Sequence, residues 1–390
     1  MATDKMVLKL EGRIDSGNAH EWEEKLISLL KNSGGRKTVF DASDLEYISS
    51  AGLRVLMKIR KLIDDELTII EVSPDVYSIF ETTGFTELFN IKKKLRVISL
   101  DGCEKIGSGF YGTVYRIDQD TIVKMYDSPD AIPMIENEKK MAKMAFVKGI
   151  PTAISFDIVK SEDGRYGSVF ELLKSKSFND IVLEQPERLE EIEKKLAELA
   201  KMVHGTEMEP GVLPLARNTF LHYLDKIESY LDKETSDKCR GMLEALPDDL
   251  HVIHGDYHMK NVMISDDEPM LIDMDTLSTG QPIFDLQALF VSYRAYAEDE
   301  PGNTERFLGI TQDMADHIWE HTIRYYFEDK NDNDISVIME KVKLLAYIRF
   351  LGMVTSGVAK REDLTAIRIE HTVAHIKELA AKYDDFDLAL

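Results

Sequence analysis

The feature that most constrains this chain is the loop His254–Asn261, which reads His-Gly-Asp-Tyr-His-Met-Lys-Asn. Its Asp256 and Asn261 are five positions apart, the spacing H-x-D-x-x-x-x-N of loops that transfer phosphoryl groups. In such a loop the aspartate receives or orients the proton of an attacking hydroxyl, and the asparagine holds a magnesium ion. Further on, Asp273 ends the apolar run Met270–Ile272, so we expect its carboxylate at a strand end, within reach of a second metal ion. The alternative is an ordinary polar turn before a strand.

The second constraint is a glycine-rich segment, Gly107–Val114, which reads G-x-G-x-x-G-x-V. In a dinucleotide-binding fold, glycines at this spacing open a helix after a strand. Here they run into a strand-like segment, Val114–Ile117, then a turn and a second strand pattern, Thr121–Tyr126. We therefore predict a hairpin whose backbone N–H groups cover nucleotide phosphates. The predicted nucleotide-binding residues of this hairpin are Gly107, Ser108, Gly109, Phe110, Tyr111, Gly112 and Val114.

Lys124 is a single lysine among the apolar residues of the second strand. We predict that it contacts the nucleotide phosphates and is held by an acidic residue of the next expected helix, Ile132–Phe146. Glu138, 14 positions after the lysine, is the favoured partner, and Glu136 on another face is the alternative. The other reading of Lys124 is a solvated strand lysine.

The segment Val169–Leu173 falls where two lobes of such a fold would join. An apolar strand that ends in Glu-Leu-Leu can offer backbone donors and acceptors to a purine edge. We therefore predict nucleotide contacts at Glu171 and Leu173, and an ordinary core strand is the alternative.

Residues 103–290 resemble the aminoglycoside phosphotransferase and choline kinase-like branch of the protein-kinase fold. The resemblance is carried by the loop around Asp256, by Leu271–Asp275 and by Pro282–Leu286. It implies ATP as donor with GTP as the alternative, Mg²⁺ as cofactor, a hydroxyl acceptor, and Asp256 as the base. It also implies metal ligation by Asn261 and Asp273, with a contribution from Asp275. Protein kinases carry arginine where this chain has Gly255, and this difference favours a small-molecule kinase. The glycine loop, however, is fuller than in many small-molecule kinases, so a protein acceptor stays open.

The first hundred residues alternate between strand and helix patterns, which predicts a separate, small α/β layered domain. We expect strands at Val7–Gly12, Lys37–Asp41 and Leu67–Val72. We expect helices at Ser16–Leu30 and Ala51–Ile63, and a short one that begins at Asp75. The lysine run Lys92–Lys94 is expected to be a solvated turn.

This region resembles the STAS domain of anti-sigma-factor antagonists. The similar segments are Gly12–Asp15, Val39–Asp41, Tyr47–Leu53, Thr83–Phe85 and Leu88–Phe89. In that family the serine at a helix start accepts phosphate, and Ser50 is the matching position; a helix N-terminus stabilises such a charge. Antagonists usually have aspartate before this serine, where this chain has Ser49. The alternative is that Ser49 or Ser50 only caps the helix.

We therefore predict an α/β STAS domain at residues 1–98, followed by an α+β two-lobed, protein-kinase-like fold. Its small, β-rich lobe is expected at residues 99–173 and its large helical lobe at residues 174–390. A net charge of −23 disfavours nucleic acid and anionic membranes as partners. Two cysteines form no framework, and no signal segment or long apolar run is present, so a cytoplasmic location is expected.

Three functions remain open. The first is an enzyme that phosphorylates a small hydroxylated, amine-bearing molecule, with the STAS domain as a regulatory part. The second is a signalling kinase that modifies Ser50 or a partner protein, with the STAS domain as the readout and as a candidate binding site for a protein partner. The third, a nucleotide-binding scaffold without turnover, is weakened by the complete set Lys124, Glu138, Asp256, Asn261 and Asp273.

Overall fold

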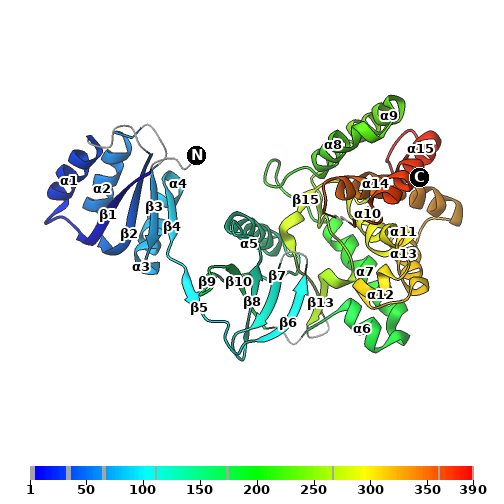
Figure 1. Ribbon diagram of the computed structural model, residues 1–390, viewed down its shortest axis with the longest axis horizontal. Helices are drawn as coiled ribbons and strands as arrows, with labels where there is room; N and C mark the ends of the chain where they lie inside the picture. The colour runs from blue at the N-terminus through cyan, green and yellow to red at the C-terminus, as the bar shows by residue number, and fades with distance from the viewer. Residues whose placement is uncertain are drawn as a thin grey trace. The chain divides into compact units, whose positions relative to one another are not determined.

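The computed structural model describes residues 5–31, 37–63, 67–109, 112–172, 175–265, 268–358 and 361–388. Three of the predicted site residues, Phe110, Tyr111 and Leu173, lie outside these ranges. The chain divides into two compact units (Figure 1). The first comprises Met1–Asp101 with Ile158–Arg165, and the second comprises Gly102–Asp157 with Tyr166–Leu390. None of the helices in the described ranges is long and apolar enough to cross a membrane.

The first unit is built on a four-stranded sheet in the order β1-β2-β3-β4, with all neighbouring strands parallel. Its elements along the chain are β1 (Lys5–Ile14), α1 (Ala19–Lys31), β2 (Lys37–Ile48), α2 (Ser50–Arg60), β3 (Thr68–Val72), α3 (Pro74–Thr82), α4 (Phe85–Leu88), β4 (Asn90–Lys93) and β5 (Arg96–Ile98). The last of these pairs in parallel with β9 (Asp157–Ser161). The expected turn at Lys92–Lys94 is wrong, because Lys92 and Lys93 end β4; both side chains are nevertheless exposed.

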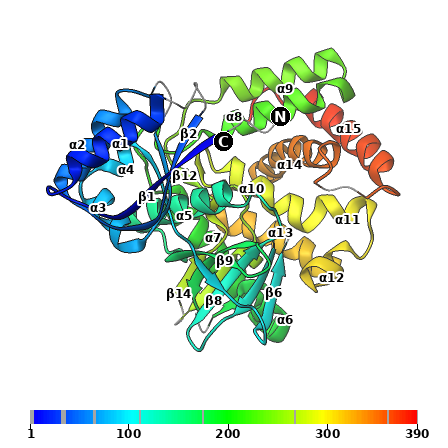
Figure 2. The same cartoon turned by 60° about the vertical axis from the view of Figure 1, so that its left-hand side comes forward.

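The core of this unit lies on one face of the sheet. Side chains along β1 alternate, with Leu8, Leu10 and Ile14 buried and Val7 exposed, which is the pattern of a strand covered on one side. Helices α1 and α2 lie side by side on the covered face (Figures 1 and 2) and bury apolar side chains against it.

Gly52 in α2 packs so closely that a side chain does not fit. A Cβ atom at this position would lie 2.7 Å from Ile48 Cγ1 and 2.8 Å from both Ile14 Cγ2 and Ile14 O. Since overpacking of this kind costs about 1–3 kcal/mol, we expect Gly52→Ala to destabilise the first unit. Amide hydrogen exchange of peptides from residues 5–63 should become faster. The matched control is Gly241→Ala, a helical glycine with no atom within 4 Å of an added Cβ, and unchanged exchange in Gly52→Ala would contradict the packing argument.

The second unit begins with a strand-rich part in which β10, β8, β7 and β6 pair in that order, all antiparallel. A helical part follows (Figures 1 and 2). The elements of the strand-rich part are β6 (Glu104–Gly109), β7 (Gly112–Arg116), β8 (Thr121–Tyr126), α5 (Ile132–Val147) and β10 (Tyr166–Glu171). The strands of the helical part are β11 (Lys176–Ser177), β12 (Val252–Ile253), β13 (Val262–Ser265), β14 (Glu268–Leu271) and β15 (Ser278–Thr279). Its helices are α6 (Phe178–Glu184), α7 (Leu189–His204), α8 (Ala216–Ile227), α9 (Lys233–Ala245), α10 (Ile283–Phe290), α11 (Tyr296–Asp299), α12 (Asn303–Leu308), α13 (Gln312–Tyr326), α14 (Asp332–Thr355) and α15 (Thr365–Lys382).

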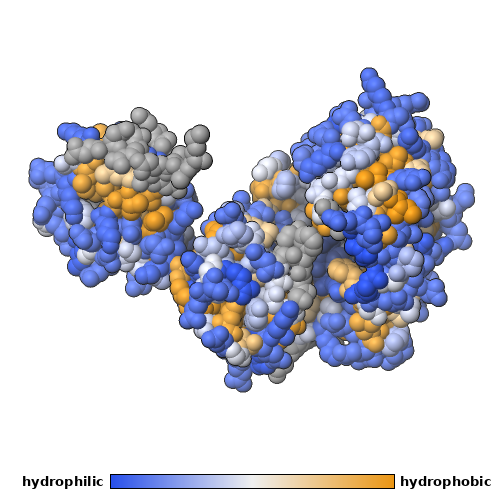
Figure 3. All heavy atoms as spheres, viewed as in Figure 1, coloured by the Kyte–Doolittle hydropathy of each residue, from blue (hydrophilic) through white to orange (hydrophobic). Residues whose placement is uncertain are grey.

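The helical part holds the larger core. Helix α14 is buried along most of its length and contacts α8, α10 and α15, so it forms the centre of this part. The visible surface is mostly hydrophilic with smaller hydrophobic areas between (Figure 3), in keeping with the net charge of −23.

Candidate active site

The glycine-rich segment forms the predicted hairpin from β6 and β7. In its register, Gly107 pairs with Val114, Ser108 with Thr113 and Gly109 with Gly112. Gly112 also faces β8, where an added Cβ would lie 1.8 Å from Met125 O, so only glycine lets the two strands approach this closely. No helix follows the glycines directly, which removes the dinucleotide-binding alternative.

Lys124 lies on β8, next to this hairpin, and is surrounded by acidic side chains. Its Nζ is 3.3 Å from Glu138 Oε1 in α5, and it also forms an ion pair with Asp273. Glu138 is buried and accepts a hydrogen bond from Tyr126, whereas Glu136 is exposed. Burial alone would lower the pKa of Lys124, but the charges of Asp273 and Glu138 outweigh it and raise the pKa above its usual range. The lysine is therefore a fixed cation at this site.

Asn261 and Asp273 are brought together by the hairpin of β13 and β14. Asn261 immediately precedes β13, Asp273 follows β14 by two positions, and Ile272 N donates to Asn261 O at 3.0 Å. Asp273 itself has φ 57° and ψ 61°, a left-handed conformation that is rare outside glycine and recurs at functional sites. The strained backbone turns this carboxylate toward Lys124.

The loop that carries Asp256 is fixed from behind by Asp285 of α10. The Asp285 carboxylate accepts hydrogen bonds from the backbone N–H groups of His254, at 2.8 Å, and Gly255, at 2.5 Å. Asp285 Oδ2 is also 2.9 Å from His204 Nε2. Burial alone would raise the pKa of Asp285, but the hydrogen bond and charge of His204 hold it below its usual range. Gly255 has φ 85°, so a glycine is required where the loop turns.

Asp256 is surrounded by hydrogen-bond donors. Its Oδ1 accepts from Arg349 Nη2 at 3.0 Å, and Asn261 Nδ2 donates to Asp256 O at 2.9 Å and is 3.4 Å from Oδ2. His258 Nε2 lies 3.6 Å from Oδ2. Burial alone would raise the pKa of Asp256, but the interaction with His258, followed by the charge of Arg349, holds the pKa well below its usual range. The carboxylate is thus ionised, and its side chain remains 38% exposed.

Arg349, on α14, is a site residue that the sequence prediction missed. Its Nη1 also donates to Gly255 O at 3.0 Å, so one guanidinium holds two consecutive residues of the loop. The available signal was a single arginine within the apolar run Leu344–Leu351, because a charge on a buried helix needs a partner. The sequence alone does not identify this partner, because Arg349 and Asp256 are 93 positions apart in the chain.

We expect Arg349→Met to lower turnover without a matching loss of nucleotide affinity. The variant removes charged hydrogen bonds worth about 1.5–3 kcal/mol each, which corresponds to about 10–100-fold in rate if they serve to position Asp256. Steady-state kinetics should show the fall mainly in kcat, with partial recovery in Arg349→Lys, which retains one donor group. Equal kcat values in wild type and Arg349→Met would show that Arg349 does not position Asp256.

Asp275 completes an acidic cluster with Glu138 and Asp273 around Lys124. Burial and the charges of Glu138 and Asp273 raise the pKa of Asp275 to about 6, against the opposing charge of Lys124. Carboxylate and amide oxygens are the ligands that Mg²⁺ prefers. The residues present therefore fit a magnesium ion, with oxygen donors available from Asn261, Asp273 and Asp275.

Two further predicted positions are Glu171, on β10, and Ser50, on α2. Glu171 is exposed at the end of β10, where it pairs in register with Thr121.

In the first unit, Ser49 is the N-cap of α2, and its side-chain oxygen accepts hydrogen bonds from Ala51 N at 3.2 Å and Gly52 N at 3.5 Å. Ser50 is the first residue of the helix and is exposed. The capping role therefore belongs to Ser49.

Comparison with known proteins places both parts of the chain in families. Residues 102–310 match the phosphotransferase enzyme family, and residues 2–97 match the STAS domain. BtrV of Bordetella bronchiseptica, which carries the provisional name of anti-sigma factor antagonist, is 36% identical over 89 residues, covering 22% of this chain and 76% of that protein.

One similar solved structure is the GDP complex of aminoglycoside 2′-phosphotransferase-IIIa, which is 15% identical in sequence. The similarity covers 78% of this chain and 98% of that chain, with a TM-score of 0.47. A choline/ethanolamine kinase family protein from Mesorhizobium loti has 15% identity, coverage of 71% and 87%, and a TM-score of 0.45. On the strength of the family match over residues 102–310, the chain belongs to the phosphotransferase enzyme family, and by the match over residues 2–97 and the similarity to BtrV it carries a STAS domain ahead of its phosphotransferase domain.

Proposed function

We propose that the second unit transfers the γ-phosphoryl group of ATP, or alternatively GTP, to a hydroxyl group of a small molecule. The observation that carries the proposal is the convergence of two groups of residues at one site. In the first group, Lys124 forms ion pairs with both Glu138 and Asp273. In the second group, the side-chain amide of Asn261 contacts the backbone oxygen and the carboxylate of Asp256. Ile272 and Asn261, which are hydrogen-bonded, join the two groups. A nucleotide-binding scaffold without turnover would need only the first.

Each residue has a definite task in this proposal. Backbone N–H groups of the glycine-rich hairpin and the Lys124 ammonium bind the phosphates, and Glu138 holds the lysine in place. When bound, Mg²⁺ would neutralise charge on the phosphates, held by Asn261, Asp273 and Asp275. Asp256 accepts a hydrogen bond from the acceptor hydroxyl and takes its proton. The hydroxyl oxygen bonds to the γ-phosphorus while the bond from that phosphorus to the β–γ bridging oxygen breaks, and the nucleoside diphosphate leaves.

We further propose that the acceptor carries an amine. The support is the net charge of −23, since an acidic protein attracts cations and raises their local concentration. The acceptor hydroxyl would approach the exposed side of Asp256, because Arg349 covers its Oδ1.

The proposal is tested by nucleoside-diphosphate release with Mg-ATP or Mg-GTP in the presence of single acceptors. Hydroxylated amines form one set, and hydroxylated compounds of similar size without an amine form the matched set. Release that depends on a hydroxylated amine and yields an acceptor one phosphate heavier supports the proposal. Release that is the same with and without every acceptor would contradict it and indicate plain nucleotide hydrolysis.

A second candidate function is favoured by the position of Ser50. Because Ser49 caps α2, the Ser50 side chain is exposed at the helix N-terminus, where a phosphate is stabilised by the helix dipole and by N–H groups. Ser50 would then be a phosphoacceptor of the STAS domain, modified by this chain or by a partner kinase. Peptide mass mapping after incubation with Mg-ATP, beside Ser50→Ala, tests this. Phosphate on the Ser50 peptide supports self-modification, and an unmodified peptide removes this chain as its kinase.

A further inference from the structure

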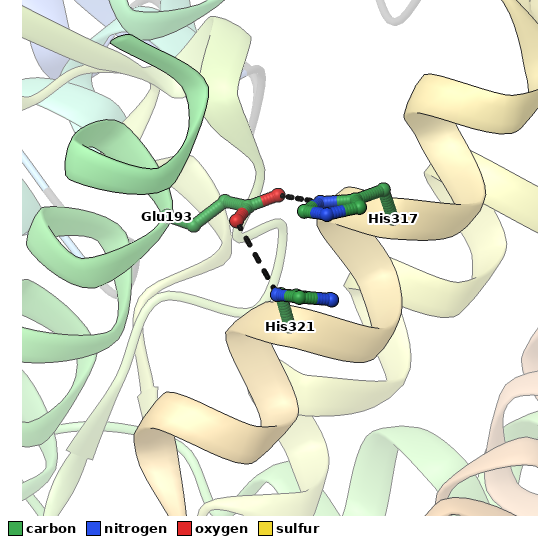
Figure 4. A group of neighbouring side chains, drawn as sticks. All are labelled: Glu193, His317 and His321. Atoms are coloured by element: carbon green, nitrogen blue, oxygen red, sulfur yellow. Dashed lines mark hydrogen bonds and ion pairs between the residues drawn. The ribbon is translucent and has the colours of Figure 1, made fainter.

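A second group of ligand-type side chains lies in the helical part of the second unit. Glu193 of α7 faces His317 and His321, which are one turn apart on α13 (Figure 4). Each of the three offers one ligand atom, a carboxylate oxygen or a ring nitrogen, and these three atoms lie within 4.8 Å of one another. His317 Nδ1 is 2.8 Å from Oε1, and His321 Nδ1 is 3.9 Å from Oε2. The two imidazole rings are stacked 3.7 Å apart, so both direct a nitrogen toward the same carboxylate.

One oxygen of the Glu193 carboxylate lacks a hydrogen-bond partner among the described residues. The Glu193 side chain is fully buried, and among the residues that the structure describes its Oε2 has no hydrogen-bond partner. A buried carboxylate oxygen without a partner is costly, and such an atom in a native fold indicates a missing ligand, water or ion. A cation bound at Oε2 would give this oxygen the partner that the fold does not supply.

We propose that Glu193, His317 and His321 bind one divalent transition-metal ion of the Zn²⁺ class. Two imidazole nitrogens and one carboxylate are ligands for Zn²⁺, Co²⁺ or Ni²⁺, whereas Mg²⁺ prefers an all-oxygen set. The ligands must approach the metal to about 2.0–2.2 Å, which small side-chain rotations can achieve from the present separations. Since the histidine side chains are 43% and 39% exposed, solvent can occupy a fourth position.

The other explanation is that Glu193 is only a hydrogen-bond partner of His317. That explanation accounts for one carboxylate oxygen and leaves Oε2 and the stacked His321 without a role. None of the three is among the residues described for the phosphotransferase site, since Glu193 lies on α7 and His317 and His321 lie on α13. A metal here would connect α7 to α13 and stabilise the helical part, because a ligand that binds only the folded state favours it.

The test is a Zn²⁺ titration of the full chain after chelator treatment, in excess Mg²⁺ so that the phosphotransferase site does not compete. His321→Gln is the main variant because it keeps the Glu193–His317 hydrogen bond, so it should fold. His375→Gln is the matched control. His375 follows His371 by one helical turn, is 42% exposed and has Glu298 Oε2 at 3.9 Å. In the described part of the chain these residues form no group of converging ligand atoms.

Wild type and His375→Gln should each bind one more Zn²⁺ than His321→Gln. In His321→Gln the affinity of this site for Zn²⁺ should fall by about a hundredfold or more. Co²⁺ should give a visible absorption band in the first two proteins and none in the third. Thermal unfolding should shift upward with Zn²⁺ in the same two proteins. Equal metal content in all three, with no difference in Co²⁺ absorption, would overturn the proposal. Glu193→Gln provides a second variant with the same expected loss.

Discussion

Asp256→Asn is expected to lower turnover by about two to four powers of ten, the usual contribution of a positioned base, while nucleotide affinity stays unchanged. The asparagine Oδ1 can still accept the hydrogen bond that Arg349 Nη2 gives to Asp256 at 3.0 Å, so the loop keeps its geometry. What is lost is the ability to accept the hydroxyl proton. Steady-state diphosphate release and nucleotide titration by calorimetry measure the two properties separately.

The control for this variant is Asp248→Asn, which makes the same chemical change. Asp248 pairs with Arg217 on the protein surface and is 62% exposed. Its turnover should match wild type. Near-wild-type turnover in Asp256→Asn would contradict the assignment of Asp256 as the base, and a loss of nucleotide affinity would point to a structural role.

Asp273→Asn is expected to remove the effect of Mg²⁺ on nucleotide binding and to lower turnover by about 10²–10³-fold, as for other losses of electrostatic stabilisation. An amide has no charge with which to hold a divalent cation beside Asn261 and Asp275. Lys124 would keep its ion pair with Glu138, so the strand and α5 should remain in place.

Calorimetric titration of ATP with and without Mg²⁺ separates this effect from a general loss of folding. In wild type and in Asp248→Asn, Mg²⁺ should strengthen binding, and in Asp273→Asn the two affinities should coincide. If Mg²⁺ strengthens ATP binding in Asp273→Asn as much as in wild type, Asp273 is not a metal ligand.

Much of this account follows from local sequence patterns. The predicted fold class, an α/β STAS domain followed by a two-lobed kinase-like fold, is confirmed by the family matches. The hairpin at Gly107–Val114 could be predicted because glycine spacing and β-branched residues act over a few positions. Glu138 could be favoured because an offset of 14 residues spans one strand, one turn and the start of a helix.

Other features depend on contacts between distant segments, which a single sequence does not reveal. The Lys124–Asp273 ion pair joins residues 149 positions apart, and Arg349 reaches Asp256 across 93 positions. The Glu193–His317 contact spans 124 positions and joins two helices that each have an ordinary amphipathic pattern. The choice between Ser49 and Ser50 as N-cap also needed the structure, because adjacent serines have the same propensity and only the backbone geometry separates them.

The most direct test of the proposed function is ³¹P NMR of the full chain with Mg-ATP and a hydroxylated amine, run beside Asp256→Asn. The account predicts that the γ-phosphate signal declines while a phosphomonoester signal grows in step with ADP, and that this exchange is slowed by about a hundredfold or more in the variant. If inorganic phosphate is the only product that forms beside ADP, or if both proteins form the phosphomonoester at the same rate, Asp256-dependent transfer to a hydroxyl is not the reaction of this site.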